Sequence, residues 1–128
     1  MRSSSAMIRY EEIAFTAYAV TDLARSRKFY EEVLGLKPTQ LKQGVPWVEY
    51  SIGTGTLGIG VSEKWKPSRD GASVALEVAD FDEAISHIKS FGIEFEMGPL
   101  ETPVCHMAVL RDPDVGKICI NKRKPGNL

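Results

Sequence analysis

The sequence is poor in cysteine, has no long apolar run and carries almost no surplus of charge. Its two cysteines, Cys105 and Cys119, are too few for a disulfide framework and fit a reducing cytoplasm. No apolar stretch approaches the ~18 residues that cross a membrane, and the first residues lack the apolar segment of a secretion signal. The net charge is -1, from 16 basic and 17 acidic residues. We therefore expect neither nucleic acid nor a membrane as a partner.

A short pattern repeats at matching places in the two halves of the chain. The segment 20–23 (VTDL) recurs 58 residues later as 78–81 (VADF), and 34–36 (LGL) recurs as 91–93 (FGI). Each half reads as a strand, an aspartate, a helix, a glycine and further strands. We therefore predict a single α+β domain over 1–128 that is built from two similar modules. The expected divisions are a first module at about 8–63, a linker at about 64–71 and a second module at about 72–124.

Two helices are predicted, over 23–34 and 81–90. Each begins after an aspartate, Asp22 or Asp80, whose carboxylate suits the exposed N–H groups of a first helical turn. Each ends at a glycine, which adopts the left-handed conformation that terminates helices. The apolar residues between these signals recur at helical spacing.

The remaining β-branched and aromatic runs predict four short strands in each module. The first module has them at 13–20, 37–42, 45–52 and 56–62, and the second at about 73–78, 93–97, 104–110 and 117–122. Alternation along the first strand places Phe15 and Ala17 on one face, with Tyr18 and Val20 under the helix.

At this point the residues resemble a known family. The segment 20–36 follows the pattern V-x-D-L-x-x-S-x-x-F-Y-x-x-V-L-G-L, and the turn 112–114 (DPD) precedes the last strand. Both features are similar to the vicinal oxygen chelate superfamily, which contains glyoxalase I, bleomycin-resistance and extradiol-dioxygenase types. The resemblance implies two βαβββ modules that form an open, incompletely closed mixed barrel, with helices outside and a concave ligand cup. It also implies a homodimer.

The resemblance also implies a place for a divalent metal, the usual cofactor of the superfamily. Its ligands are His or Glu at four strand positions, which fall on Phe15, Gly60, Ser73 and Cys119 in this sequence. Because catalytic metal sites need at least three protein ligands, these four residues predict that no metal or other cofactor binds there. The alternative is a shifted site in which Glu63 turns inward and joins Glu77 and His106.

Glu77 stands among apolar residues on the face that alternation assigns to the cup. It is either a ligand contact or general base with a raised pKa, or a rim carboxylate paired with a basic residue. His106 is a weaker catalytic candidate. Cys105 and His106 must face opposite sides of their strand, and the sequence leaves open which one faces the cup.

Three other residues complete the predicted ligand site. Cys119 occupies a metal-ligand position but equally suits a small apolar packing role. Trp47 begins a strand and could cover the cup, or could serve packing or a dimer contact. Ser73 occupies another of the superfamily's ligand positions. The predicted ligand-binding set is therefore Phe15, Trp47, Ser73, Glu77 and Cys119.

Two functions follow from the resemblance and from these residues. The favoured one is a glyoxalase/bleomycin-resistance-like protein that binds a small molecule in its cup without the superfamily's metal. The alternative is an enzyme of the same superfamily, a lyase, isomerase or dioxygenase, with a displaced site built from Glu77, His106 and Cys119. This set would be poor for a metal unless another acid, such as Glu49, joined it. The sequence has no glycine-rich phosphate loop and no nucleophile elbow. Nothing in it identifies the ligand.

Overall fold

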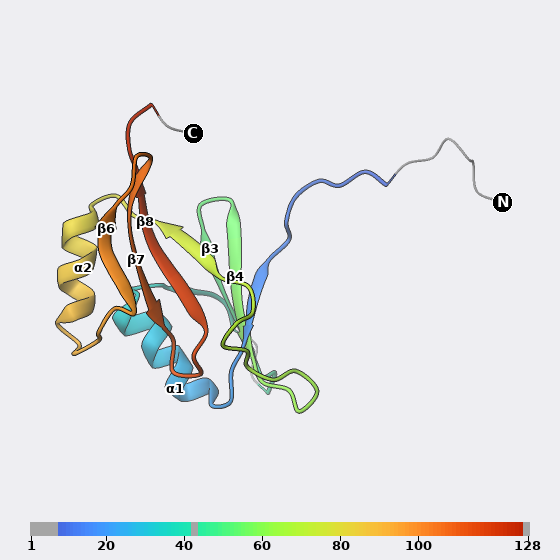
Figure 1. Cartoon of the computed structure of the whole chain (residues 1–128). Coiled ribbons are helices and arrows are strands. Elements are labelled where there is room, and N and C mark those ends of the chain that lie inside the picture. The colour runs from blue at the N-terminus through green and yellow to red at the C-terminus, as the bar shows by residue number, and fades with distance from the viewer. Residues whose placement is uncertain (1–7, 42–43, 127–128) are drawn as a thin grey trace.

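A computed structural model describes residues 8–41 and 44–126 and contains two strand–helix–three-strand modules (Figure 1). The first consists of β1 (Thr16–Ala19), α1 (Leu23–Lys28), the wider helical turn η1 (Phe29–Val33), β2 (Pro38–Leu41), β3 (Trp47–Ile52) and β4 (Gly55–Gly60). The second consists of β5 (Val74–Glu77), α2 (Phe81–Lys89), β6 (Met97–Glu101), β7 (Cys105–Arg111) and β8 (Lys117–Arg123). Within the described ranges, no helix is both long enough and apolar enough to span a membrane.

The two sheets have the same topology, which confirms the duplicated unit predicted from the sequence. Their strand orders are β1-β4-β3-β2 and β5-β8-β7-β6. In each sheet the first strand runs parallel to the last, and the other neighbours are antiparallel. The sheets form an open, curved arrangement, and no strand pairing among the described residues closes them into a barrel.

The helices begin and end where the sequence predicts. The carboxylates of Asp22 and Asp80 each accept a 3.0 Å hydrogen bond from the N–H group three residues further on. Gly35 and Gly92 follow with φ values of 72° and 76°. The first helix changes pitch at Phe29, whose carbonyl accepts a bond from the N–H group five residues later. The stretch predicted as one helix is therefore an α-helix that widens in its second half.

One strand lies further along the chain than the sequence predicts. The sequence predicts a strand at about 93–97, whereas β6 begins at Met97, which pairs with Val109. Ile93 and Phe95 are apolar because they pack against the core, not because they pair in the sheet. Pro99 lies inside β6 and has no backbone N–H group to donate to a neighbouring strand. This is tolerated because β6 is an edge strand, with a neighbour on one side only.

A single core lies between the sheets and the helices. Alternate strand residues point into it, and Tyr18 and Val20 are 8% and 1% exposed, as the alternation of the first strand predicts. Both modules contribute to this one cluster: Tyr50, Leu57 and Ile59 from the first, and Leu110, Ile118 and Ile120 from the second. The other face of each sheet, here called its outer face, points away from the helices.

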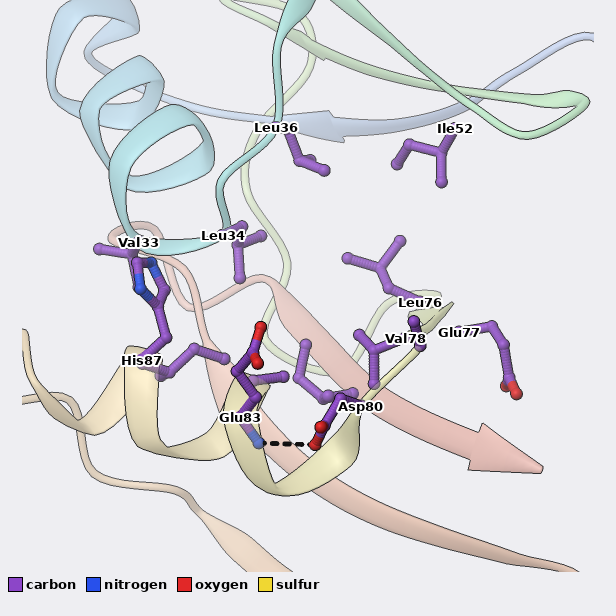
Figure 2. Close-up of a pocket in the computed structure, with 14 residues that line it drawn as sticks. Val33, Leu34, Leu36, Ile52, Leu76, Glu77, Val78, Asp80, Glu83 and His87 are labelled. Atoms are coloured by element: carbon purple, nitrogen blue, oxygen red, sulfur yellow. Dashed lines mark hydrogen bonds between the residues drawn. The ribbon is translucent and has the colours of Figure 1, made fainter. Parts of the chain in front are cut away.

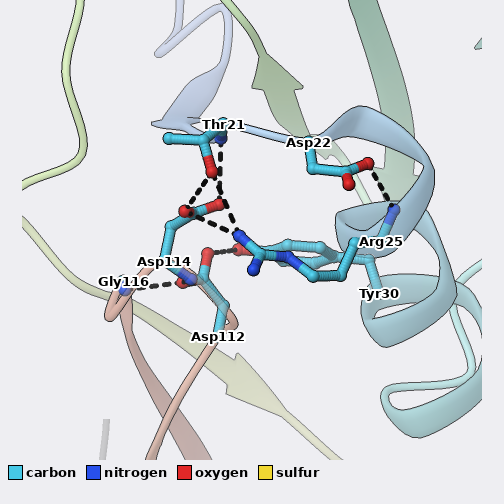
Figure 3. Close-up of polar contacts among 7 residues, drawn as sticks. All are labelled: Thr21, Asp22, Arg25, Tyr30, Asp112, Asp114 and Gly116. Carbon is cyan, nitrogen blue, oxygen red and sulfur yellow. Dashed lines mark hydrogen bonds and ion pairs between the residues drawn. The ribbon is translucent and has the colours of Figure 1, made fainter.

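The turn between β7 and β8 ties the second module to the first (Figure 3). Asp112 is buried, and its Oδ1 accepts bonds from the N–H groups of Asp114 and Gly116 at 2.9 and 2.6 Å. Its Oδ2 accepts a 2.7 Å bond from the hydroxyl of Tyr30. Burial, with the nearby charge of Asp112, raises the pKa of Tyr30 far above its usual value, so that the hydroxyl remains a donor.

Two further contacts join the modules. Asp114 accepts hydrogen bonds from the N–H and the hydroxyl of Thr21, at 3.0 and 2.6 Å, and pairs with Arg25 at 2.9 Å. The hydroxyl of Tyr18 donates to the carbonyl of Lys117 at 2.5 Å and accepts from the N–H of Val74 at 2.7 Å. Burial raises the pKa of Tyr18 to about 12. These contacts fix β1 against β5 and β8 and set the relative position of the two outer faces.

Candidate functional site

The outer face of the first sheet is covered by one indole ring. Trp47 opens β3 and lies flat across Gly58 and Gly60 of the neighbouring strand β4. A Cβ atom on Gly58 would stand 2.4 Å from Cζ2 of Trp47, and one on Gly60 would stand 2.6 Å from its Cε3. Both glycines are therefore required for the ring to lie against the sheet.

Two further aromatic rings meet Trp47. Phe15 approaches it edge-on, with ring centroids 5.5 Å apart and an interplanar angle of 77°. Trp65, from the segment that links the modules, lies 6.4 Å away at 33°. Phe15 and Trp65 remain 50% and 37% exposed. We call these three residues the aromatic platform, an open surface to which a flat apolar molecule could stack.

Glu49 holds the indole in place. It is two residues from Trp47 on β3, so both side chains project from the outer face. The Nε1–H group of Trp47 donates a 2.8 Å hydrogen bond to Oε2 of Glu49. The bond satisfies the polar edge of the ring, and its apolar face lies along the sheet.

Strand pairing corrects one position in the predicted metal site. In the second module, Cys119 of β8 pairs with Ala75 of β5. The equivalent pairing in the first module joins Ala17 to Gly58, so Gly58 rather than Gly60 is the counterpart of Cys119. The sequence pattern missed this because the register between β1 and β4 is set by contacts about 40 residues apart. Gly58 has no side-chain donor either, and Trp47 covers it.

The metal-ligand positions do not suit a metal in this chain. With Gly58 in place of Gly60, the four positions are Phe15, Gly58, Ser73 and Cys119. Together they offer one thiol and one neutral hydroxyl. Burial raises the pKa of the Cys119 thiol, and one thiol cannot hold a metal alone. Across residues 8–41 and 44–126, no three His, Cys, Asp or Glu side chains are grouped to hold a metal ion. The metal-free state itself stays a prediction.

Glu77 lies at the end of β5 and is held by its own sheet. Its Oε1 accepts a 2.8 Å bond from the side-chain amide of Asn121, and its Oε2 accepts a 2.8 Å bond from the N–H group of Arg123. The Arg123 N–H group is the largest cause of a pKa below the usual value. This direction is opposite to the raised pKa that a general base requires.

The structure separates the two catalytic candidates. His106 pairs with Lys122, whereas Glu77 pairs with Asn121, so alternation along β8 places His106 and Glu77 on opposite faces of the sheet. The His106 ring instead packs against Phe81 of α2, with centroids 5.7 Å apart. The side chain that shares the outer face with Glu77 and Cys119 is Cys105.

The cysteines are not paired with each other. Cys105 lies opposite Arg123 and Cys119 lies opposite Val109, and both thiols are free. The outer face of the second sheet thus presents Ser73, Glu77 and the edge of Cys119. Among the described residues, no hydrogen bond or aromatic contact joins these side chains to the aromatic platform.

Sequence reasoning underrated one member of the site. Trp65 lies in the predicted linker, and the sequence leaves open whether it packs, contacts a second copy or serves as a stacking surface. In the structure the linker folds back so that the Trp65 ring meets Trp47. The alternating glycines at 58 and 60 are a sequence signal for a large side chain on one face of the strand, which is that of Trp47 and not of Trp65. The identity of that side chain depends on strand pairing.

The model of the Glyoxalase/Bleomycin resistance protein/Dioxygenase superfamily matches residues 12–120. The chain belongs to this superfamily. The match spans both modules and agrees with the resemblance found in the sequence. A comparison with curated proteins finds no match.

Solved structures of the superfamily share the fold. A glyoxalase/dioxygenase from Nostoc punctiforme is 18% identical, with a TM-score of 0.77 over 95% of this chain and 99% of that chain. An antibiotic binding protein from Streptomyces sp. CB03234 is 20% identical, with a TM-score of 0.76 over 92% and 100%. A glyoxalase/bleomycin resistance protein from the same organism is 22% identical, with a TM-score of 0.73 over 87% and 100%. At these identities the likeness establishes the fold.

Proposed function

We propose that this member of the superfamily binds a flat, largely apolar small molecule on its aromatic platform and needs no metal to do so. The observation that carries the proposal is Trp47, which lies flat over Gly58 and Gly60 between two partly exposed rings. Aromatic rings provide large contact areas at low conformational cost, and a stacked pair contributes about 0.5–1.5 kcal/mol beyond its buried area.

The chemistry of the superfamily's ligand positions supports binding over metal-dependent catalysis. Phe15 and Gly58 replace two donors with apolar surface. Ser73, Glu77 and Cys119 are the polar contacts that we propose from the outer face of the second sheet. One structural relative is an antibiotic binding protein, which agrees with a small-molecule ligand. A displaced catalytic site built on the outer face from Glu77 and Cys119 would lack His106, because the His106 ring packs against Phe81 on the helix side of the sheet.

We also propose a homodimer. Phe15 and Trp65 leave apolar surface open on the platform, and Ile13 is 80% exposed just before it. A second copy of the chain can cover this surface and enclose the ligand. Sedimentation velocity from micromolar to near-millimolar concentration should give twice the mass of one chain. A single-chain mass throughout that range would contradict the proposal. The free cysteines agree with the cytoplasm as the proposed location.

A titration of the platform tests the proposed function. The probe is 2-naphthol, a neutral bicyclic aromatic molecule, and the readout is isothermal titration calorimetry. We expect saturable binding that Trp47→Leu weakens by about tenfold or more, since most of the stacking surface is lost. Phe91→Leu is the matched control, because Phe91 is 45% exposed but packs beside His87 at the end of α2. Equal affinity in the wild type and Trp47→Leu would refute the proposal.

A further inference from the structure

A second cavity lies between the modules on their helix side, where the platform residues take no part. Its volume is about 360 Å³. Figure 2 shows Leu36 and Ile52 of the first module facing Leu76 and Val78 of the second across it. These four aliphatic side chains are partly buried: each packs against the core and also borders the cavity.

The size and apolar walls of this cavity suit a small organic molecule. An apolar cavity of about 150 Å³ stays dry and accommodates benzene, so one of 360 Å³ would take about twelve to fifteen non-hydrogen atoms. Water at the aliphatic walls gains few hydrogen bonds, whereas the polar side of the cavity, which opens to solvent, stays hydrated. A bound hydrocarbon group would therefore be favoured over water.

The charged side chains at the cavity are acidic. Among the described residues that line it are three acids, Glu77, Asp80 and Glu83, one histidine, His87, and no lysine or arginine. Glu77 borders the cavity from the end of β5, although its side chain lies on the outer face of the sheet. Asp80 is engaged as the cap of α2, and Glu77 is held by Asn121 and Arg123. In Figure 2 the carboxylate of Glu77 points away from the aliphatic walls, whereas that of Glu83 projects from α2 toward them.

We propose that this cavity binds a small apolar amine in its ammonium form. The hydrocarbon part would lie among Leu36, Ile52 and Leu76, and the ammonium group would donate to the carboxylate of Glu83. The acidic surroundings select a cation over a carboxylate of the same shape. The site is separate from the aromatic platform, so each can be tested without the other.

Three probes of nearly equal shape test the proposal: 4-phenylbutylamine, 4-phenylbutanol and 4-phenylbutyrate. Binding is followed by methyl NMR of protein labelled at Ile, Leu and Val. We expect the amine to shift the methyl signals of Leu36, Ile52 and Leu76 and to bind about fivefold tighter than the alcohol, as a partly exposed ion pair allows. The carboxylate probe should bind most weakly.

Matched variants assign the effect to this site. Glu83→Gln should reduce the affinity for the amine to that for the alcohol. Asp82→Asn, on the same helical turn but outside the lining residues, should leave the fivefold preference in place. Ala84→Met, which fills the cavity, should weaken binding of all three probes, and Trp47→Leu should change none. The methyl spectrum shows that each variant is folded. The proposal is wrong if the amine shifts none of these signals, shows no preference over the alcohol, or keeps its preference in Glu83→Gln.

Discussion

The hydroxyl of Tyr30 donates a 2.7 Å hydrogen bond to the carboxylate of Asp112, which lies 82 residues away in the other module. Both side chains are almost wholly buried, at 0% and 4% exposure. Asp112 also accepts hydrogen bonds from two N–H groups of its own turn, so the Tyr30 hydroxyl completes a set of donors around a buried carboxylate. Buried acids need such donors, because a lost bond there costs the full desolvation of the oxygen.

Tyr30→Phe should therefore lower the free energy of unfolding by about 1–3 kcal/mol, because one buried carboxylate oxygen loses its donor. The measurement is urea denaturation followed by circular dichroism. Tyr10→Phe serves as the control, since Tyr10 is 86% exposed. If both variants unfold at the wild-type midpoint, the bond does not hold the modules together.

The second contact between the modules should depend on pH. Burial raises the pKa of Asp114, but its bonds from Thr21 and the charge of Arg25 outweigh this, and the net shift is downward. A folded-state pKa below the unfolded value of about 3.9 means that the stabilisation is complete above pH 4 and is lost as pH falls through the folded pKa. Asp114→Asn should cost about 1–2 kcal/mol at pH 7 and less at pH 3. A cost independent of pH in denaturation experiments would contradict this account.

The turn that carries these two aspartates also contains a strained residue. Val115 has a φ of 62°, a left-handed conformation that a β-branched side chain adopts at a cost. Val115→Asn should raise the unfolding free energy by about 1 kcal/mol, because asparagine tolerates this conformation. Val104→Asn is the control, because Val104 is 53% exposed and is not among the residues with positive φ. It should not raise the unfolding free energy. Thermal and urea unfolding of both variants provide the comparison.

Local signals in the sequence predicted much of this fold. Asp22 and Asp80 mark the helix starts, because a cap depends on residues three positions apart. Alternation along the first strand depends only on neighbouring residues as well, and it correctly places Tyr18 and Val20 in the core. The repeated pattern around these residues predicted two modules, and the sheets show them.

The features that the sequence could not predict depend on contacts between distant segments. Which of Cys105 and His106 faces outward follows from the pairing of β7 with β8. The assignment of Gly58 instead of Gly60 follows from the pairing of β1 with β4. The lowered pKa of Glu77 comes from a backbone N–H group 46 residues away. No local pattern encodes these partners.

The glycines under the aromatic platform can be tested directly. Gly58→Ala places a Cβ atom 2.4 Å from the Trp47 ring, which must then leave the sheet. We expect a changed tryptophan emission spectrum and an affinity for 2-naphthol about tenfold lower. Gly55→Ala is the control on the same strand, because its Cβ would make only an ordinary contact of 3.5 Å with the Ile52 carbonyl. Normal binding by Gly58→Ala would show that the position of the ring is unimportant.

The central claim is that the platform binds its ligand without a metal. The most direct measurement is the calorimetric titration of 2-naphthol on protein purified without chelator, repeated after exhaustive dialysis against EDTA and after addition of Zn²⁺ or Ni²⁺. Elemental analysis accompanies each sample. The account predicts less than stoichiometric metal and one dissociation constant in all three samples, with binding weakened by about tenfold or more in Trp47→Leu. One equivalent of bound metal whose removal abolishes binding, or whose retention depends on Glu77, would contradict it.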